Sequence, residues 1–159
     1  MNPDLERALE ILGEWVLEHD APSAARVNVK IAPENVAAAA KALVDVRWGY
    51  LTAITGLDTE LESQQLEVLY HYCRGADILT LRALVPRDNG KLPSVCGAVP
   101  IATVYERELA EMFGVTVTDT PDPSRLFLPD DWPDGLYPLR KDADLTSAAP
   151  DRKEESNER

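Results

Sequence analysis

The stretch LEVLYHYCRGADILTLRALV, residues 66–85, decides the fold. Every second residue from Leu66 to Tyr72 is apolar or aromatic, and Glu67 and His71 lie between them, which is the period of a strand with one buried face. Arg74-Gly75-Ala76 then supplies a tight turn, and a second apolar run follows. The stretch therefore predicts two antiparallel strands, over residues 66–73 and 77–85.

The residues before this hairpin alternate between helical and extended patterns. Asn2-Pro3 is a helix start, because Asn caps a helix and Pro is tolerated in its first turn. We expect helices over residues 3–18 and 33–46, strands over residues 26–31 and 50–55, and a turn over residues 56–63. The prediction is an α+β domain with an antiparallel sheet of about four strands, the last three forming a meander, and helices packed on one face.

The last third of the chain changes character after a helix. That helix is expected from Val99 or Ala102 to Phe113, with Gly114 as its cap, and the core domain is expected to span residues 1–117. Residues 118–142 are rich in Pro and Asp, yet large apolar side chains recur along them: Leu126, Phe127, Leu128, Trp132, Leu136, Tyr137 and Leu139. Because such side chains need a surface to pack against, we expect an extended arm that wraps a partner. Residues 143–159 are expected to be a disordered tail.

Composition excludes several classes of function. The chain has 159 residues and a formal net charge of -12, so nucleic acid is not an expected partner, because its phosphates would be repelled. Two cysteines make no disulfide framework, which favours a reducing cytoplasm. No secretory signal and no apolar run long enough to span a membrane is recognised, so we expect any membrane association to be peripheral, through partners.

Few residues suggest chemistry of their own. His71 and Cys73 lie two apart on a predicted strand and could share a metal ion, with Cys96 as a third ligand, although an ordinary strand thiol beside a surface imidazole is the commoner arrangement. No G-x-S-x-G or glycine-rich phosphate loop is present. No catalytic, cofactor-binding or metal residue is therefore assigned, and a free-standing metal enzyme using His71 and Cys73, or an acidic binding module, are the alternatives from other classes.

Charged clusters mark two candidate anchoring points. In Glu106-Arg107-Glu108, either Arg107 pairs with Glu111 on the helix surface, or one of the two glutamates turns inward and pairs with a cation of the arm, such as Arg125 or Arg140. Arg140-Lys141-Asp142 places two cations in an otherwise acidic chain. These cations are either a solvated cluster or an anchor to acidic groups or backbone carbonyls of a partner.

Four blocks together resemble a known family: Glu106-Arg107-Glu108, Glu111-Met112-Phe113-Gly114, residues 125–132 and Pro138-Leu139-Arg140-Lys141-Asp142. Their order and spacing are similar to those of the thirty-kilodalton subunit of respiratory complex I, the NADH–quinone oxidoreductase. Membrane-bound [NiFe] hydrogenases and F420H2 dehydrogenases share this family. Ala110-Glu111 stands where members usually carry Tyr-Asp, and this departure adds weight to a related hydrogenase or an atypical complex over ordinary NADH-dependent complex I.

The resemblance implies a structural subunit that carries no cofactor of its own. It implies a place in the hydrophilic arm of the complex, on the cytoplasmic side of the membrane, against the large subunit of the quinone or [NiFe] site and near the small iron–sulfur subunit. Iron–sulfur clusters and a flavin or [NiFe] centre would lie in those partners. The residues expected to form the interface and anchor the arm are Glu106, Arg107, Glu108, Arg125, Trp132, Arg140, Lys141 and Asp142.

Overall fold

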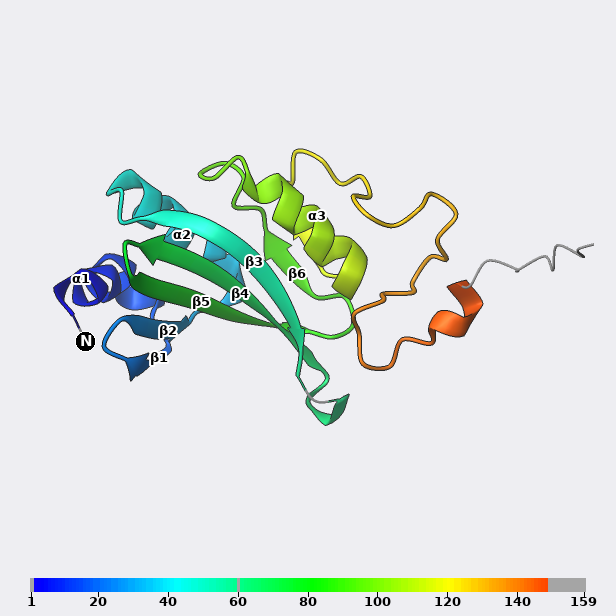
Figure 1. Cartoon of the computed structure of the whole chain (residues 1–159), viewed down its shortest axis with the longest axis horizontal. Helices are drawn as coiled ribbons and strands as arrows, with labels where there is room; N and C mark the ends of the chain where they lie inside the picture. The colour runs from blue at the N-terminus through cyan, green and yellow to red at the C-terminus, as the bar shows by residue number, and fades with distance from the viewer. Residues whose placement is uncertain (1, 60, 149–159) are drawn as a thin grey trace, which may run out of the picture.

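A computed structural model describes residues 2–59 and 61–148 of the chain and gives it an α+β fold (Figure 1). The α-helices are α1 (Pro3–Leu12), α2 (Val36–Asp45) and α3 (Ala102–Phe113). The main sheet contains β1 (Glu18–Ser23), β2 (Arg26–Lys30), β3 (Tyr50–Asp58), β4 (Gln65–Arg74) and β5 (Asp77–Pro86). A second, two-stranded sheet contains β6 (Lys91–Pro93) and β7 (Thr116–Thr118).

The β3–β4–β5 meander is confirmed. β4 pairs antiparallel with both neighbours, and Cys73 lies opposite Ile78 next to the hairpin turn. The side chains predicted to face inward, from Leu66 to Tyr72, are at most 2% exposed. Together with alternate residues of β2 and β5 and the inner faces of all three helices, they form one apolar core. Burial raises the pKa of Tyr70 far above its usual range, and the nearby carboxylate of Glu106 on α3 adds to this.

The sheet has five strands, and its order is β1-β2-β5-β4-β3. β2 pairs with β5 in parallel, whereas the other pairs in this sheet are antiparallel. A sheet that is mostly antiparallel was therefore predicted correctly, but one strand was missed. β3 is also three residues longer than expected, since it continues through Asp58.

The expected first helix was too long. α1 ends at Leu12, because Gly13 adopts a left-handed φ of 51° and its N–H bonds back to Leu9. A short 3₁₀ turn follows over Gly13–Trp15, and Glu18–Ser23 is then the edge strand β1, exposed along its whole length. Its charges and Pro22 are typical of the end of a helix, but the same residues also protect a sheet edge from further pairing.

α3 and its cap are as predicted, and they connect the core to the arm. Gly114 is left-handed with φ 71° and donates to the carbonyl of Ala110. The ring of Phe113 lies so close to Gly56 of β3 that a Cβ there would come within 2.4 Å of it, so a glycine is required at this crossing. β7 then pairs in parallel with β6, with Val117 opposite Leu92, and starts the arm beside the core.

The arm itself, residues 118–142, has almost no regular structure and runs beside α3 and the end of β3 (Figure 1). Leu145–Ala148 form a short 3₁₀ turn beyond it. The rest of the expected tail, residues 149–159, lies outside the described residues.

Candidate functional site

The end of the arm is latched to the core by a buried arginine. Arg87 follows β5 and is only 4% exposed. Its guanidinium donates to the carboxylate of Asp58, at the end of β3, and to that of Asp142 in the arm. The second oxygen of Asp58 accepts from the backbone N–H of Lys141 at 2.8 Å. Two strands of the core and the arm therefore meet at one guanidinium.

Electrostatics supports a fully charged latch. The bond to Arg87 is the largest influence on the Asp58 carboxyl and lowers its pKa, against the opposing effect of burial. The same bond raises the pKa of Arg87 further above neutrality. Because both groups stay ionised at neutral pH, the pair remains a charge-assisted hydrogen bond.

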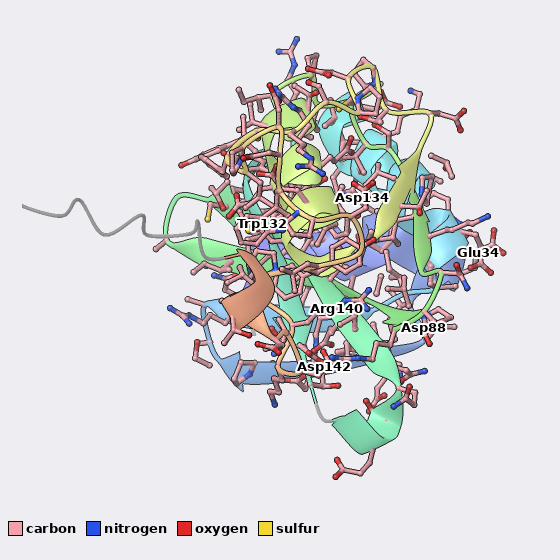
Figure 2. All side chains as sticks on the ribbon, turned by 90° about the vertical axis from the view of Figure 1, so that its right-hand side faces the viewer. Glu34, Asp88, Trp132, Asp134, Arg140 and Asp142 are labelled. Carbon is pink, nitrogen blue, oxygen red and sulfur yellow. The ribbon has the colours of Figure 1, made fainter. Side chains whose placement is uncertain are left out.

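The two cations of the predicted Arg140-Lys141-Asp142 cluster take part in the same latch. Arg140 donates from Nε to the carbonyl of Phe113 at 2.8 Å and from Nη2 to the carbonyl of Arg87 at 2.9 Å. Its guanidinium also lies 4.5 Å from the ring centre of Tyr137. Lys141 donates from Nζ to the carbonyl of Thr59. Figure 2 shows this end of the molecule, with Arg140 and Asp142 labelled.

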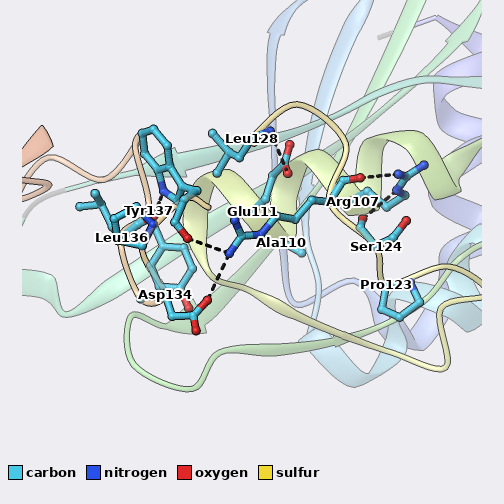
Figure 3. Close-up of a pocket in the computed structure, with 13 residues that line it drawn as sticks. Arg107, Ala110, Glu111, Pro123, Ser124, Leu128, Asp134, Leu136 and Tyr137 are labelled. Atoms are coloured by element: carbon cyan, nitrogen blue, oxygen red, sulfur yellow. Dashed lines mark hydrogen bonds and ion pairs between the residues drawn. The ribbon is translucent and has the colours of Figure 1, made fainter. Parts of the chain in front are cut away.

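α3 holds the middle of the arm through two side chains. Glu111 accepts from three successive backbone N–H groups, those of Leu126, Phe127 and Leu128, at 3.0, 2.7 and 3.4 Å. Arg107 donates to the carbonyls of Ser124 and Arg125 at 2.9 and 2.6 Å. Glu111 and Arg107 lie one turn apart, so the same face of the helix binds consecutive donors and acceptors of the arm (Figure 3).

Arg125 then organises the loop from within. It donates to the carbonyls of Pro129 and Trp132 at 2.7 and 3.1 Å and pairs with Asp134. The indole N–H of Trp132 closes the loop on the carbonyl of Leu136 at 2.8 Å. A pocket of about 210 Å³ lies between α3 and this loop (Figure 3). The arginines and Glu111 that line it are occupied in holding the loop.

Glu106 is the glutamate of Glu106-Arg107-Glu108 that turns inward, but it does not pair with a cation of the arm. Glu106 is 2% exposed, but its carboxylate accepts from Ser94 Oγ, the N–H of Val95 and the Cys96 thiol, at 2.8, 2.7 and 3.2 Å. It therefore fixes the loop before α3, while Arg125 and Arg140 bind carbonyls of the arm and core. The side chain of Glu108 makes no hydrogen bond or ion pair in the part of the chain that the structure describes.

Most predicted anchoring residues thus gather along the arm, but their polar partners belong to this chain. The expected wrapping of a partner by the arm stays a prediction, and in the described part of the chain the backbone and cations of the arm bind the core. The apolar side chains of the arm are available to such a partner, because Phe127 is 63% and Leu139 is 53% exposed. Sequence reasoning missed Asp58, Arg87 and the role of Glu111.

His71 and Cys73 do share a face of the sheet, as predicted. They line a hollow of about 530 Å³ on the side that faces away from the core, where His71 Nδ1 lies 3.2 Å from Thr80 Oγ1. Burial lowers the pKa of His71. Cys96 lies with Glu106, and no cluster of three His, Cys, Asp or Glu side chains suited to a metal ion occurs within residues 2–59 and 61–148.

The fold and the latch define a small α+β protein with a long arm that is fixed along its polar side and exposes large apolar groups. In the described part of the chain, no helix is both long and apolar enough to cross a membrane. Residues 29–149 match the family described as respiratory-chain NADH dehydrogenase, 30 Kd subunit, and the chain belongs to this family.

Relatives come from more than one kind of complex. The chain is 31% identical over 153 residues to a subunit of the NADH-quinone oxidoreductase of Parvibaculum lavamentivorans, covering 89% of this chain and 76% of the relative. It is 34% identical over 131 residues to formate hydrogenlyase subunit 5 of Escherichia coli (strain K12). That match covers 80% of this chain but spans only 23% of the relative.

Among solved structures, the fold is similar to a chain in the structure of the membrane-bound sulfane sulfur reductase, an archaeal respiratory membrane complex. The TM-score is 0.75 at 21% identity, covering 98% of this chain and 95% of that chain. This likeness supports the fold. These relatives are named as subunits of an NADH-quinone oxidoreductase and of a formate hydrogenlyase. The resemblance to the thirty-kilodalton subunit family that the sequence indicated is confirmed.

Proposed function

We propose that this chain is a cofactor-free structural subunit in the hydrophilic arm of a complex I-like NADH–quinone oxidoreductase. It supports electron transfer to quinone, coupled to ion translocation, by holding the subunits that carry the redox centres. The observation that carries this proposal is the two-sided arm: its backbone and cations are bound to the core, while Phe127 and Leu139 face solvent. Apolar side chains on a fixed backbone are suited to burial against another protein.

The proposed partners are the large subunit of the quinone site and the small iron–sulfur subunit, which would contain the redox centres. One longer relative supports a permanent contact with a larger partner. Because the chain matches only 23% of formate hydrogenlyase subunit 5, that protein joins an equivalent domain to a much longer polypeptide. Covalent joining holds two domains at a high effective concentration. This arrangement fits a permanent contact between this chain and a separate, larger subunit. Association with the cytoplasmic side of the membrane would be peripheral.

A second candidate is the equivalent subunit of a membrane-bound [NiFe] hydrogenase or F420H2 dehydrogenase. The match to formate hydrogenlyase subunit 5 favours it, as does Ala110-Glu111 in place of Tyr-Asp. The structure gives Glu111 a clear task, since its longer side chain reaches three N–H groups of the arm.

The test is purification of the tagged chain from native membranes. The proposal expects iron–sulfur subunits to co-purify, with flavin- and NADH-binding subunits for the first candidate and a [NiFe] subunit for the second. Purification without any iron–sulfur subunit would overturn the proposal.

A double variant, Arg140→Ala with Lys141→Ala, tests the arm. It removes the cations that bind the carbonyls of Phe113, Arg87 and Thr59, so the arm should detach and partner yield should fall. The matched control is Arg7→Ala with Lys41→Ala, which removes two cations from exposed helical ion pairs. Unchanged assembly and activity in the arm variant would exclude arm anchoring as the basis of the function.

A further inference from the structure

The arm loop over residues 124–136 is folded before any partner arrives. Its backbone groups are bonded by Arg107 and Glu111 of α3 and by Arg125 within the loop. The entropy of ordering this loop is therefore lost when the chain folds, and little remains to be lost on binding. A loop of this kind presents its exposed side chains in fixed positions.

One large apolar side chain stands out on this loop. Phe127 donates its N–H to Glu111 at 2.7 Å, so its backbone is fixed, yet the residue is 63% exposed. Burying an aromatic side chain is among the largest single contributions to a protein interface, and it is most favourable when the side chain is already held in place. Phe127 has the properties of an anchor for a partner's pocket.

The charges beside Phe127 indicate what that pocket must be like. Asp130, Asp131 and Asp134 are exposed, and the carboxylates of Asp130 and Asp131 make no ion pair among the described residues. Arg125, the basic residue of this loop, is occupied by carbonyls and Asp134. The loop therefore combines one apolar anchor with an acidic rim.

We infer that Phe127 inserts into an apolar pocket of a partner subunit whose rim carries lysine or arginine side chains. This inference rests on the proposed function, because it assumes that the chain works inside a complex. A second copy of this chain does not fit, since each copy carries a net charge of -12 and the same acidic loop would face it. An anionic membrane surface would be repelled in the same way.

The experiment compares Phe127→Ala with Leu17→Ala in the intact complex, immobilised through a tag on this chain. Leu17 is 62% exposed just before β1, so it is a matched loss of exposed apolar surface away from the arm. Phe127→Ala should speed the loss of the partner subunits by about tenfold or more. Leu17→Ala should leave it unchanged, and Phe127→Leu should restore most of the retention. Equal retention in Phe127→Ala and wild type would overturn the inference.

The acidic rim is tested by salt. Asp130→Asn with Asp131→Asn should slow reassociation with the partner and flatten its dependence on KCl over roughly 0.05–0.5 M, because the exposed charges steer the encounter. If the salt dependence of the Asp130→Asn, Asp131→Asn variant equals that of wild type, the partner's pocket does not have a basic rim. If the wild-type chain retains no subunit at all, it is the proposed function that fails. If wild type and Phe127→Ala retain partners equally, only the anchor fails.

Discussion

The carboxylate of Asp58 and the guanidinium of Arg87 are joined in the interior although 29 residues separate them in the chain, and both side chains are at most 4% exposed. Arg87 reaches outward with its second nitrogen to Asp142, 55 residues further on. One end of this three-residue chain of charges is thus buried in the core, and the other is 55% exposed at the end of the arm. The two ends should respond differently to mutation.

Arg87→Met should strongly destabilise the chain. It leaves the Asp58 carboxylate buried without a counter-charge, a change that typically costs about 3–5 kcal/mol. Urea unfolding of the isolated chain measures the loss. Arg74→Met is the control, because Arg74 forms an exposed pair with Asp4 and should matter by less than about 1 kcal/mol. A similar small effect for both variants would contradict a structural role for the Arg87 pair.

Asp142→Asn should separate arm detachment from core stability. Asp58 keeps its partner in this variant, so the unfolding free energy should change by less than about 1 kcal/mol. The arm should nevertheless lose protection, because the charged contact from Arg87 to residue 142 is weakened. Hydrogen exchange of residues 137–142 should rise while exchange in β4 stays constant. Unchanged exchange throughout would show that Asp142 does not hold the arm.

Acid should weaken the same latch. The bond from Arg87 lowers the pKa of Asp58 in the folded chain below its unfolded value, which is about 4. Folded Asp58 therefore contributes its full stabilisation above about pH 4, and this is lost as the pH falls through the lower, folded pKa. Urea unfolding between roughly pH 7 and pH 2 measures the slope. Asp58→Asn should remove this contribution to the slope, and a slope as steep as that of wild type would contradict it.

Local periodicity explains why much of the fold could be predicted. The buried residues of the β4–β5 hairpin lie two apart, and those of α3 lie three to four apart. Gly114 marks where the helix ends. β1 was missed because both faces of an exposed edge strand are polar, so no alternation remains to be recognised. The inward position of Glu106 did have a signal, since it lies on the helical face of Ala102, Leu109 and Phe113.

The latch had no such signal. Asp58 and Arg87 are single charges at the ends of strands, and nothing near either of them in the sequence indicates the other. They meet because the register of β3 on β4 and of β4 on β5 brings the ends of β3 and β5 to the same end of the sheet, on either side of the start of β4. Arg140 and Lys141 were recognised as candidate anchors because they are cations in an acidic chain. Whether the carbonyl groups that they bind belong to this chain or to a partner depends on the path of the arm, which local sequence does not indicate.

Glu111→Ala should release the middle of the arm. It removes the shared acceptor of three N–H groups, and hydrogen bonds to a charged group contribute roughly 1.5–3 kcal/mol each. Because the freed amides can reach water, the net loss in unfolding free energy should lie near the lower value. Limited proteolysis and exchange of the Phe127 amide measure the release. Glu108→Ala is the control from the same helix, and equal protease sensitivity of the two variants would contradict the role of Glu111.

Gly114→Ala should displace the arm through the ring of Tyr137. A Cβ at Gly114 would lie 2.4 Å from ring atoms of Tyr137, and the left-handed φ of 71° adds backbone strain of about 1–2 kcal/mol. Gly75→Ala provides the matched control, since Gly75 has a φ of 61° but nothing within 4 Å of the added carbon. Any destabilisation of Gly114→Ala beyond that of Gly75→Ala therefore reports the contact with the arm.

A second substitution separates the steric effect from the backbone strain. Tyr137→Ala removes the ring that the new methyl group would meet, so in this background Gly114→Ala should cost no more than Gly75→Ala does in wild type. The urea unfolding free energies of wild type, the two single variants and the double variant complete a double-mutant cycle. If Gly114→Ala costs the same with and without the Tyr137 ring, the arm does not pack on the helix cap in solution. A coupling energy well above zero would show that the arm is held against the end of α3 before any partner binds.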